Sequence, residues 1–201
     1  MHTLRLLLEK FWMDRSIRKA PLFDQVDCAL SFNLPSDPAV DLFSNFDSLS
    51  IAADHPSRKR SDAYYVNADH VLRTHTSAHD NQYLRDSDGF CIVADVFRRD
   101  QIDSTHFPIF HQAEIVRLYS VETLTKIADG LPSSELPVSE RESYHYDSEM
   151  SEEVWSKLSR VIISDLKSFH ENLIRHLIKR DDLEFKWVSA FFPFTEPFLE
   201  L

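Results

Sequence analysis

Glycine is nearly absent from this 201-residue chain, which contains only Gly89 and Gly130. Glycine ordinarily makes up about 7% of a protein. An enzyme that binds phosphates usually needs glycines where its backbone approaches the ligand closely. We therefore expect either that side chains handle any ligand here, or that a glycine-rich part of the protein lies outside this chain.

Cysteine, long apolar runs and basic residues are also scarce. Cys28 and Cys91 lie far apart without paired-ligand spacing, which excludes a disulfide framework and fits a reducing compartment. No apolar run approaches the about 20 residues that span a bilayer, so we expect no membrane partner. The formal net charge of -11 gives no broad basic surface for nucleic acid, although Arg58, Lys59 and Arg60 form a local basic run.

The N-terminal segment is basic but does not resemble a targeting peptide. Glu9 and Asp14 interrupt its basic residues, and transit peptides avoid acidic groups. Apolar residues recur there at helical spacing, at Leu4, Leu7, Leu8 and Phe11. We therefore predict an amphipathic helix of the mature protein and no transit peptide in this chain.

Apolar periodicity predicts the main elements along the chain. Gly89 to Arg98 and Phe110 to Tyr119 are predicted strands separated by a loop, and Ser151 to Lys179 is a predicted helix. Its apolar stripe comprises Val154, Leu158, Val161, Ile162, Leu166, Phe169, Leu173 and Leu177. A strand hairpin beside one long helix predicts an α+β architecture with an antiparallel sheet.

The remaining segments have less regular sequence patterns, which predict mainly loops and short strands. Residues 33 to 48 form a turn-rich connection, and residues 54 to 70 form a polar loop with a short strand at Ala63 to Val66. Residues 128 to 148 form an exposed insertion. A final strand begins at Leu183 to Val188 and is still continuing where the chain ends at Leu201.

The hairpin carries an unusual set of polar side chains around its loop. Side chains alternate along a strand, so Arg98 and Asp100 continue the face of Ile92, Ala94 and Val96. On the second strand Phe110, Gln112 and Glu114 share one face. Antiparallel pairing then predicts one floor that holds Arg98, Asp100, Gln112 and Glu114.

Such a floor suits a zwitterion next to a phosphate. An arginine fork holds carboxylate or phosphate oxygens, and carboxylates with an amide hold an ammonium group. The pattern alone is equally compatible with a solvent-exposed hairpin whose surface ion pairs contribute little. His75 and His79 have a zinc-like spacing, but no third ligand has matching context, so we predict no metal site and disfavour a metal hydrolase.

Longer sequence strings resemble one enzyme family. FRRD at 97–100, followed by His106 and Phe110, resembles motif 2 of class II aminoacyl-tRNA synthetases. The longer string DSTHFPIFHQAE at 103–114 is similar to phenylalanyl-tRNA synthetases, most of all to the monomeric mitochondrial type. Three further strings agree in order: NFDSLSIAADHPSRK at 45–59, LRTHTSAH at 72–79 and WVSAFFPFTEP at 187–197.

The resemblance implies a reaction and its residues. The family activates phenylalanine with ATP and Mg²⁺ and transfers it to tRNA(Phe). In this sequence Arg98, Asp100, His106 and Phe110 match the ATP-binding positions, with Arg98 and His106 in catalytic roles. The substrate-binding positions are His75, Thr76, Ser77, Gln112, Glu114, Phe192 and Phe194. Pattern alone allows Ser77 to be a helix N-cap, and it allows Phe192 and Phe194 to be ordinary core residues.

The same resemblance implies a domain organisation and a cellular setting. Residues 1–45 would be an N-terminal helix and connection, and residues 46–201 a partial catalytic domain with motif 2 at 97–119. Motif 3 and the anticodon-binding domain would be absent. We therefore expect a fragment inactive alone, from a monomeric enzyme of the mitochondrial matrix. A non-catalytic, synthetase-like binding or regulatory paralogue is the alternative.

The chain departs from the family pattern at two positions near the expected site. Asp80 stands where the family usually has glutamine after HTSAH. Ile115 replaces a small residue directly after Glu114. The effect of either change on the pocket is left open by the sequence.

Overall fold

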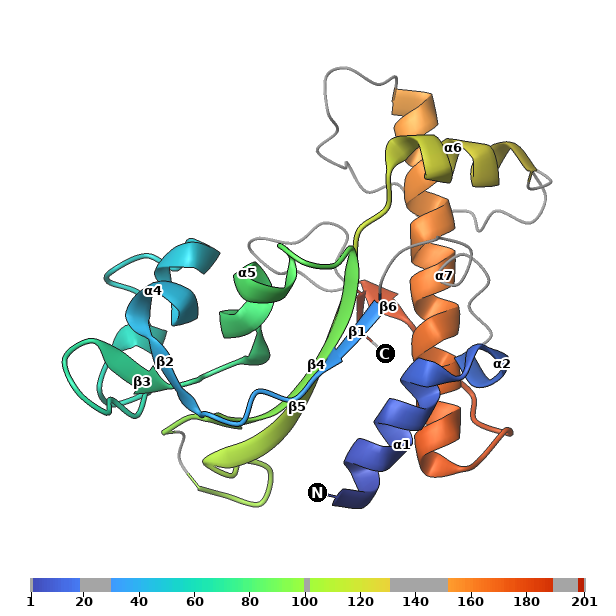
Figure 1. Cartoon of the computed structure of the whole chain (residues 1–201). Helices are drawn as coiled ribbons and strands as arrows, with labels where there is room; N and C mark the ends of the chain where they lie inside the picture. The colour runs from blue at the N-terminus through green and yellow to red at the C-terminus, as the bar shows by residue number, and fades with distance from the viewer. Residues whose placement is uncertain (1, 19–29, 100–101, 131–151, 190–198, 201) are drawn as a thin grey trace. The chain divides into compact units, whose positions relative to one another are not determined.

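The computed structural model describes residues 2–18, 30–99, 102–130, 152–189 and 199–200 (Figure 1). The chain divides into two compact units, one comprising Met1–Val26 with Tyr119–Leu201 and the other Asp27–Leu118. None of the described helices is long and apolar enough to cross a membrane.

The second unit is built on a three-stranded sheet of order β1-β4-β5. Strand β4 (Gly89–Phe97) pairs antiparallel with β5 (Ile109–Arg117), and β1 (Leu30–Asn33) pairs parallel with β4 on its other edge. As the middle strand, β4 is the most apolar of the three, and most of its residues are buried. Figure 1 shows β4 and β5 as one long ribbon, and β5 contains Phe110, Gln112 and Glu114 of the expected site.

A small two-stranded sheet and several short helices complete this unit. Strands β2 (Ala39–Asp41) and β3 (His70–Leu72) are antiparallel. Helix α4 (Leu42–Asn45) follows β2 directly and is capped by Asp41, whose carboxylate accepts from the Ser44 amide at 2.7 Å. The short 3-10 helices are η1 (Asp47–Leu49), η2 (Pro56–Arg58) and η3 (Thr76–His79), and α5 (Asp80–Tyr83) continues η3.

A cluster of buried apolar residues holds these short elements together. Phe46 and Val71 are completely buried at its centre, and Val40, Ala63 and Ala78 complete it. Burial of such side chains is the main source of stability for elements too short to persist alone. The cluster thereby fixes the path of the chain from β3 into η3, where the expected substrate-binding residues lie.

The first unit is mainly helical in its described part. Helix α1 (His2–Met13) packs on α7 (Glu152–Ile178), with the Phe11 and Phe169 rings edge-to-face at 5.2 Å. The short α2 (Arg15–Arg18) follows α1, and α6 (Val121–Gly130) contacts α7. Strands β6 (Val188–Ser189) and β7 (Leu199–Glu200) form a two-residue antiparallel pair.

Most predicted elements agree with the structure within one or two residues. The predicted stripe of α7 is confirmed for Leu158, Val161, Phe169 and Leu173, which are buried. It is wrong for Leu166, which is 43% exposed. The neighbouring Asp165 is buried instead, because its carboxylate accepts a hydrogen bond from the Tyr119 hydroxyl at 3.0 Å.

Three of the shorter predictions need correction. The predicted strand at 63–66 is reduced to an isolated antiparallel bridge between Tyr65 and Val71, on a strand that also pairs with β2. The segment 183–187 is not a strand, and pairing begins only at Val188. The predicted connection at 33–48 contains β2 and α4, and the predicted insertion at 128–148 lies outside the described residues beyond the end of α6.

Candidate active site

The register of the hairpin places the expected floor on one face. Gln112 lies opposite Ala94, Glu114 opposite Ile92, and Phe110 opposite Val96. Directly paired residues of antiparallel strands point to the same side. The alternation predicted from the sequence is therefore confirmed for Gln112, Glu114 and Phe110.

Two buried polar residues fix the segment that crosses this floor. The Asn45 side chain accepts from the Thr74 amide at 3.1 Å and donates to the Thr74 hydroxyl at 3.0 Å. The Arg73 carbonyl accepts from the Phe97 amide at 2.9 Å, which ties the same segment to the end of β4. These bonds position the residues that follow, from His75 to Ser77.

Glu114 is the centre of a hydrogen-bond network. The Thr76 hydroxyl donates to Glu114 Oε2 at 2.5 Å, and the Ser77 hydroxyl lies 2.8 and 2.9 Å from the two carboxylate oxygens. Gln112 Oε1 accepts from the Thr76 amide at 3.1 Å. The structure therefore brings together four of the predicted substrate-binding residues. Ser77 does not act as a helix N-cap, because its hydroxyl is directed to Glu114.

A second carboxyl group, that of Asp80, contacts Glu114. Burial and the charge of Glu114 raise the pKa of Asp80 to about 7. The Cys91 thiol on β4 also lies near Glu114, and burial together with that charge raises its pKa to about 12. At neutral pH the thiol is therefore protonated, and Asp80 is close to its titration midpoint.

The two histidines of the segment are held in their neutral form. Burial lowers the pKa of His75, and burial with the nearby Arg73 lowers the pKa of His79. The His75 Nε2 lies 3.0 Å from the Asn45 carbonyl oxygen, which fixes this nitrogen as the donor. The His79 Nε2 lies 2.7 Å from Arg73 Nη1 and accepts from it. Each ring therefore has one defined tautomer.

Arg98 stands at the loop end of the same face. Its Nε donates to the Thr74 carbonyl at 2.9 Å, and its guanidinium lies 5.2 Å from the centre of the Phe110 ring. The two terminal nitrogens of the fork have no protein partner among the residues that the structure describes. Arg98 is thus oriented by its bond to Thr74, and a guanidinium held in this way can bind an anion through its terminal nitrogens.

The hairpin loop places His106 on the surface. Asp103 accepts from the His106 amide at 2.8 Å, and its two carboxylate oxygens each lie 2.9 Å from His106 Nδ1. Hydrogen bonds from Thr105 and His106 hold the pKa of Asp103 well below its usual range. The His106 ring is exposed, so the loop presents it to solvent with its orientation set by Asp103.

Three predicted site residues, Asp100, Phe192 and Phe194, lie outside the described residues. No pattern in the sequence pointed to Asn45, Thr74 or Arg73 as members of the site, although they hold it in place. All three are buried polar residues, and only a fold shows which polar side chains become buried.

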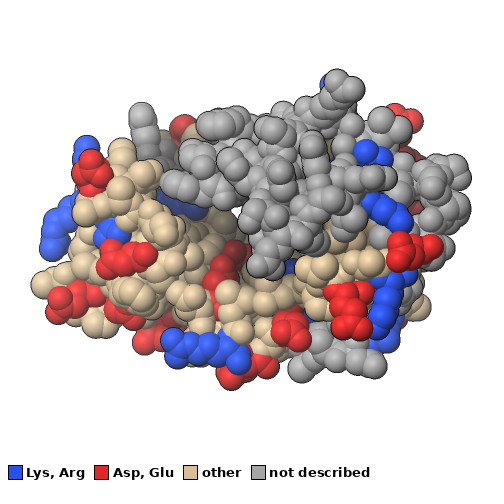
Figure 2. Space-filling model, turned by 90° about the horizontal axis from the view of Figure 1, so that it is seen from above, with Lys and Arg blue, Asp and Glu red and all other residues tan. Residues whose placement is uncertain are grey.

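The arrangement has the chemistry of a site for a small zwitterion beside an anion. Hydroxyl, amide and carboxylate oxygens gather around Glu114, and a guanidinium lies at the other end of the same face. No group of three or more metal-binding side chains occurs within the described residues. Acidic and basic side chains are interspersed over the described part of the face in Figure 2, in keeping with a net charge of -11.

Comparison with known proteins defines the class of this fold and site. The family model described as tRNA synthetases class II core domain (F) matches residues 17–133. This range contains the whole β4–β5 hairpin and the segment that carries His75, Thr76 and Ser77. The chain belongs to the class II core domain family of tRNA synthetases.

Individual relatives narrow the likeness further. The chain is 42% identical over 192 residues to the mitochondrial phenylalanine–tRNA ligase of Rattus norvegicus, covering 94% of this chain and 38% of that protein. It is 33% identical over 206 residues to the mitochondrial enzyme of Saccharomyces cerevisiae, covering 82% and 44%. A phenylalanine–tRNA ligase alpha subunit of Neisseria meningitidis is 33% identical over 177 residues. The chain therefore spans less than half the length of the relatives it matches.

Proposed function

We propose that this chain carries the amino-acid-activating part of a phenylalanine–tRNA ligase. The main support is the single face on which Arg98, Gln112 and Glu114 stand, with Thr76 and Ser77 bonded to Glu114. The relatives named as phenylalanine–tRNA ligases supply the substrate of the proposal.

The amino group of phenylalanine would be bound at Glu114. An ammonium group has three donors, and the carboxylate of Glu114 has acceptor capacity beyond the two hydroxyl bonds it already receives. Gln112 would lie beside it on the same face. Phe192 and Phe194 would enclose the benzyl ring, where aromatic pairs add about 0.5–1.5 kcal/mol beyond burial.

ATP would be bound toward the loop end of the floor. Phe110 offers the adenine the face of its ring that Arg98 does not cover. His106 would reach phosphate oxygens from the exposed loop, and Asp100 would lie close to them.

Arg98 would carry most of the chemical step. The substrate carboxylate attacks the α-phosphorus, the bond to the β-phosphate oxygen breaks, and pyrophosphate leaves. Negative charge grows on the phosphoryl oxygens during this displacement, and the fixed guanidinium stabilises it without having to reorganise. Because the bond to Thr74 holds Arg98 in advance, the two reacting groups would meet in a defined orientation.

Mg²⁺ would be bound mainly by the phosphates of ATP, as is usual for this ion, and would neutralise charge on the leaving pyrophosphate.

The remaining parts of the proposal concern the whole protein. Transfer of phenylalanine to tRNA(Phe) would take place in the full-length enzyme, acting as a monomer in the mitochondrial matrix. The mitochondrial names of the rat and yeast relatives support this location.

Pyrophosphate exchange tests the proposal. The product of the full-length transcript should exchange labelled pyrophosphate into ATP only when phenylalanine is present. Arg98→Ala should lower the exchange rate by about 100-fold or more, the effect of removing one preorganised transition-state donor. The neighbouring Arg99→Ala is the matched control, because Arg99 lies over Tyr64 at 5.4 Å and is exposed.

The outcomes separate clearly. Exchange with phenylalanine that survives Arg99→Ala and is lost in Arg98→Ala supports the proposal. Absence of exchange in the wild-type product, while a related synthetase is active in the same assay, would overturn it.

A further inference from the structure

Asp80 adds a carboxyl group beside Glu114 that nothing in the proposed mechanism uses. It is the first residue of α5, which follows η3 directly, and its carboxyl group lies close enough to Glu114 for that group's charge and hydrogen bonding to raise the pKa of Asp80. Its Oδ1 is buried and receives no hydrogen bond from any described residue. Two carboxyl groups in such contact require a proton between them, because two carboxylates offer only acceptors.

The network decides which group carries that proton. Glu114 accepts hydrogen bonds from two hydroxyls, and such bonds stabilise the charged form of a carboxylate. Asp80 has a buried oxygen without a donor, which disfavours its charged form. The proton is therefore carried by Asp80, which donates to Glu114.

The other titratable groups around Asp80 and Glu114 do not change the assignment of the proton to Asp80. The Cys91 thiol on β4 is protonated, and His75 and His79 on the adjoining segment are neutral near pH 7. Arg73 donates to the carbonyls of Asp95 and Pro35 as well as to His79. Arg98 is directed to the Thr74 carbonyl. No cation among the described residues is paired with the two carboxyl groups, which together hold one negative charge.

We propose that Asp80 is a second carboxylate of the amino-group subsite, which gives up the proton shared with Glu114 when a ligand ammonium is bound. The inference rests on the proposed function, since it takes the ammonium of phenylalanine as the ligand group. In this step the O–H bond of Asp80 breaks and the proton passes to the solvent. The ammonium then donates the hydrogen bonds that the shared proton had provided. Its positive charge is balanced by the new negative charge on Asp80.

Calorimetry in buffers of different ionisation enthalpy measures the released proton directly. The 201-residue chain is titrated with phenylalanine at about pH 6, below the titration midpoint of the pair, and at about pH 8.5, above it. We expect release of nearly one proton per phenylalanine bound at the lower pH and almost none at the higher pH. 3-Phenylpropanoate, which lacks the amino group, should release none at either pH.

Variants assign the proton to Asp80. Asp80→Asn and Asp80→Gln should abolish proton release, and at the lower pH they should change the affinity for phenylalanine but not for 3-phenylpropanoate. Wild-type chain that binds phenylalanine without releasing a proton would overturn this inference alone. Failure of the wild-type chain to bind phenylalanine would instead count against the proposed function.

A ligand-free measurement keeps the inference testable whatever the variants do. Carbon-13 NMR of the Asp80 carboxyl should give a midpoint near 7 in the wild-type chain. In Glu114→Gln the midpoint should fall toward the usual aspartate range, because the neighbouring charge is removed. An Asp80 midpoint in the usual range in the wild-type chain would refute the shared proton.

Discussion

Thr76 shows how much a single hydroxyl contributes at the candidate site. Its side chain is completely buried and donates to Glu114 at 2.5 Å. Thr76→Val keeps the shape but removes the donor, so we expect the free energy of unfolding to fall by about 1.5–3 kcal/mol, the range for hydrogen bonds to charged groups. Urea denaturation of both chains measures the difference.

The exposed Thr3 on α1 provides the matched control for that substitution. Thr3→Val should change the free energy of unfolding by about 0.5 kcal/mol or less, as is usual for surface positions. Equal effects of the two substitutions would show that the Thr76 hydroxyl has no special role.

The raised pKa of Asp80 also predicts how the stability of the protein depends on pH. Its folded-state pKa of about 7 lies above the value of about 3.9 for an unfolded aspartate. Between these values the native state binds more protons than the unfolded state, so this contribution to stability decreases as pH rises. The melting temperature of the wild type relative to Asp80→Asn should therefore fall from about pH 5 to about pH 7.5.

The wild type must be compared with Asp80→Asn because His75 and His79 change the stability with pH in the direction opposite to Asp80. Their pKa values are lowered on folding, so their contribution to stability increases with pH below about 6.5. Subtracting the Asp80→Asn curve removes this shared part. A difference in melting temperature that stays constant with pH would contradict the prediction.

The sequence predicted the site residues on regular strands better than those that support them. Gln112 and Glu114 follow from strict alternation on β5, which places them on one face whatever packs against it. Asn45 and Thr74 belong to short segments whose position depends on the buried cluster around Phe46 and Val71. No local pattern encodes that tertiary contact.

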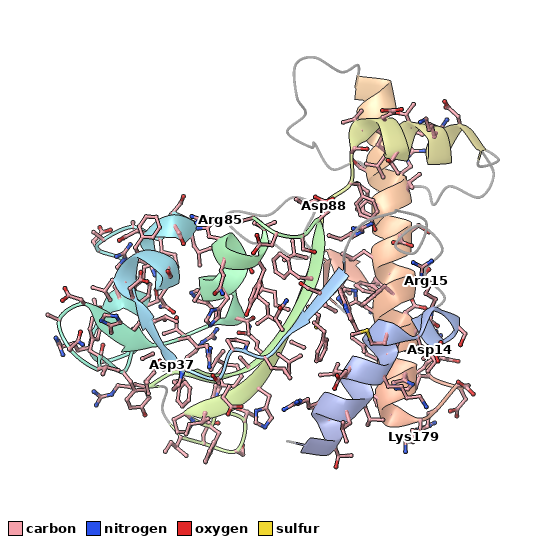
Figure 3. All side chains as sticks on the ribbon, viewed as in Figure 1. Asp14, Arg15, Asp37, Arg85, Asp88 and Lys179 are labelled. Atoms are coloured by element: carbon pink, nitrogen blue, oxygen red, sulfur yellow. The ribbon has the colours of Figure 1, made fainter. Side chains whose placement is uncertain are left out.

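At the scale of elements, the end of α7 contains a residue in an unfavourable conformation. Lys179, which is labelled in Figure 3, follows the last helical residue with φ 58°. The next amide, that of Arg180, donates to the Arg175 carbonyl at 3.3 Å. This left-handed position normally carries glycine. Lys179→Gly should therefore raise the free energy of unfolding by about 0.5–1 kcal/mol.

Lys157 within α7 is the control for this substitution. Lys157→Gly should lower the free energy of unfolding by about 1 kcal/mol, since glycine is unfavourable in a helix interior. Thermal denaturation of the two variants should give shifts of opposite sign. A lower melting temperature for Lys179→Gly than for the wild type would contradict the proposed strain.

Element prediction succeeded where a segment was long and failed where it was short. The pattern of α7 and of the β4–β5 hairpin extends over many residues, so their existence and type followed from periodicity. Strands β1, β2 and β3 have only three or four residues each. Such segments become strands because a partner strand lies beside them, and the sequence does not state which partner that is.

At the scale of the whole molecule, the chain divides into two compact units, and each contains buried apolar residues. In the first unit Phe11 is 1% exposed, and its ring lies against Phe169. Phe11→Ala should cost about 3–5 kcal/mol, as do other large-to-small substitutions in cores. Hydrogen exchange should show lost amide protection in α1 and α7, with protection in β4 retained.

The exposed Leu4 on the same helix is the control, since Leu4→Ala should leave the exchange of α7 unchanged. Equal loss of protection in α7 and β4 after Phe11→Ala would show that the chain unfolds as one cooperative body.

The burial of Cys91 has a practical consequence for following the motions of the sheet. Alkylating reagents react with the thiolate, and this thiol is 2% exposed with a pKa raised to about 12. In a Cys28→Ser chain, labelling of Cys91 must wait until the middle strand opens. The rate at which Cys91 is alkylated therefore reports how often β4 opens, and mass spectrometry measures this rate without an attached dye.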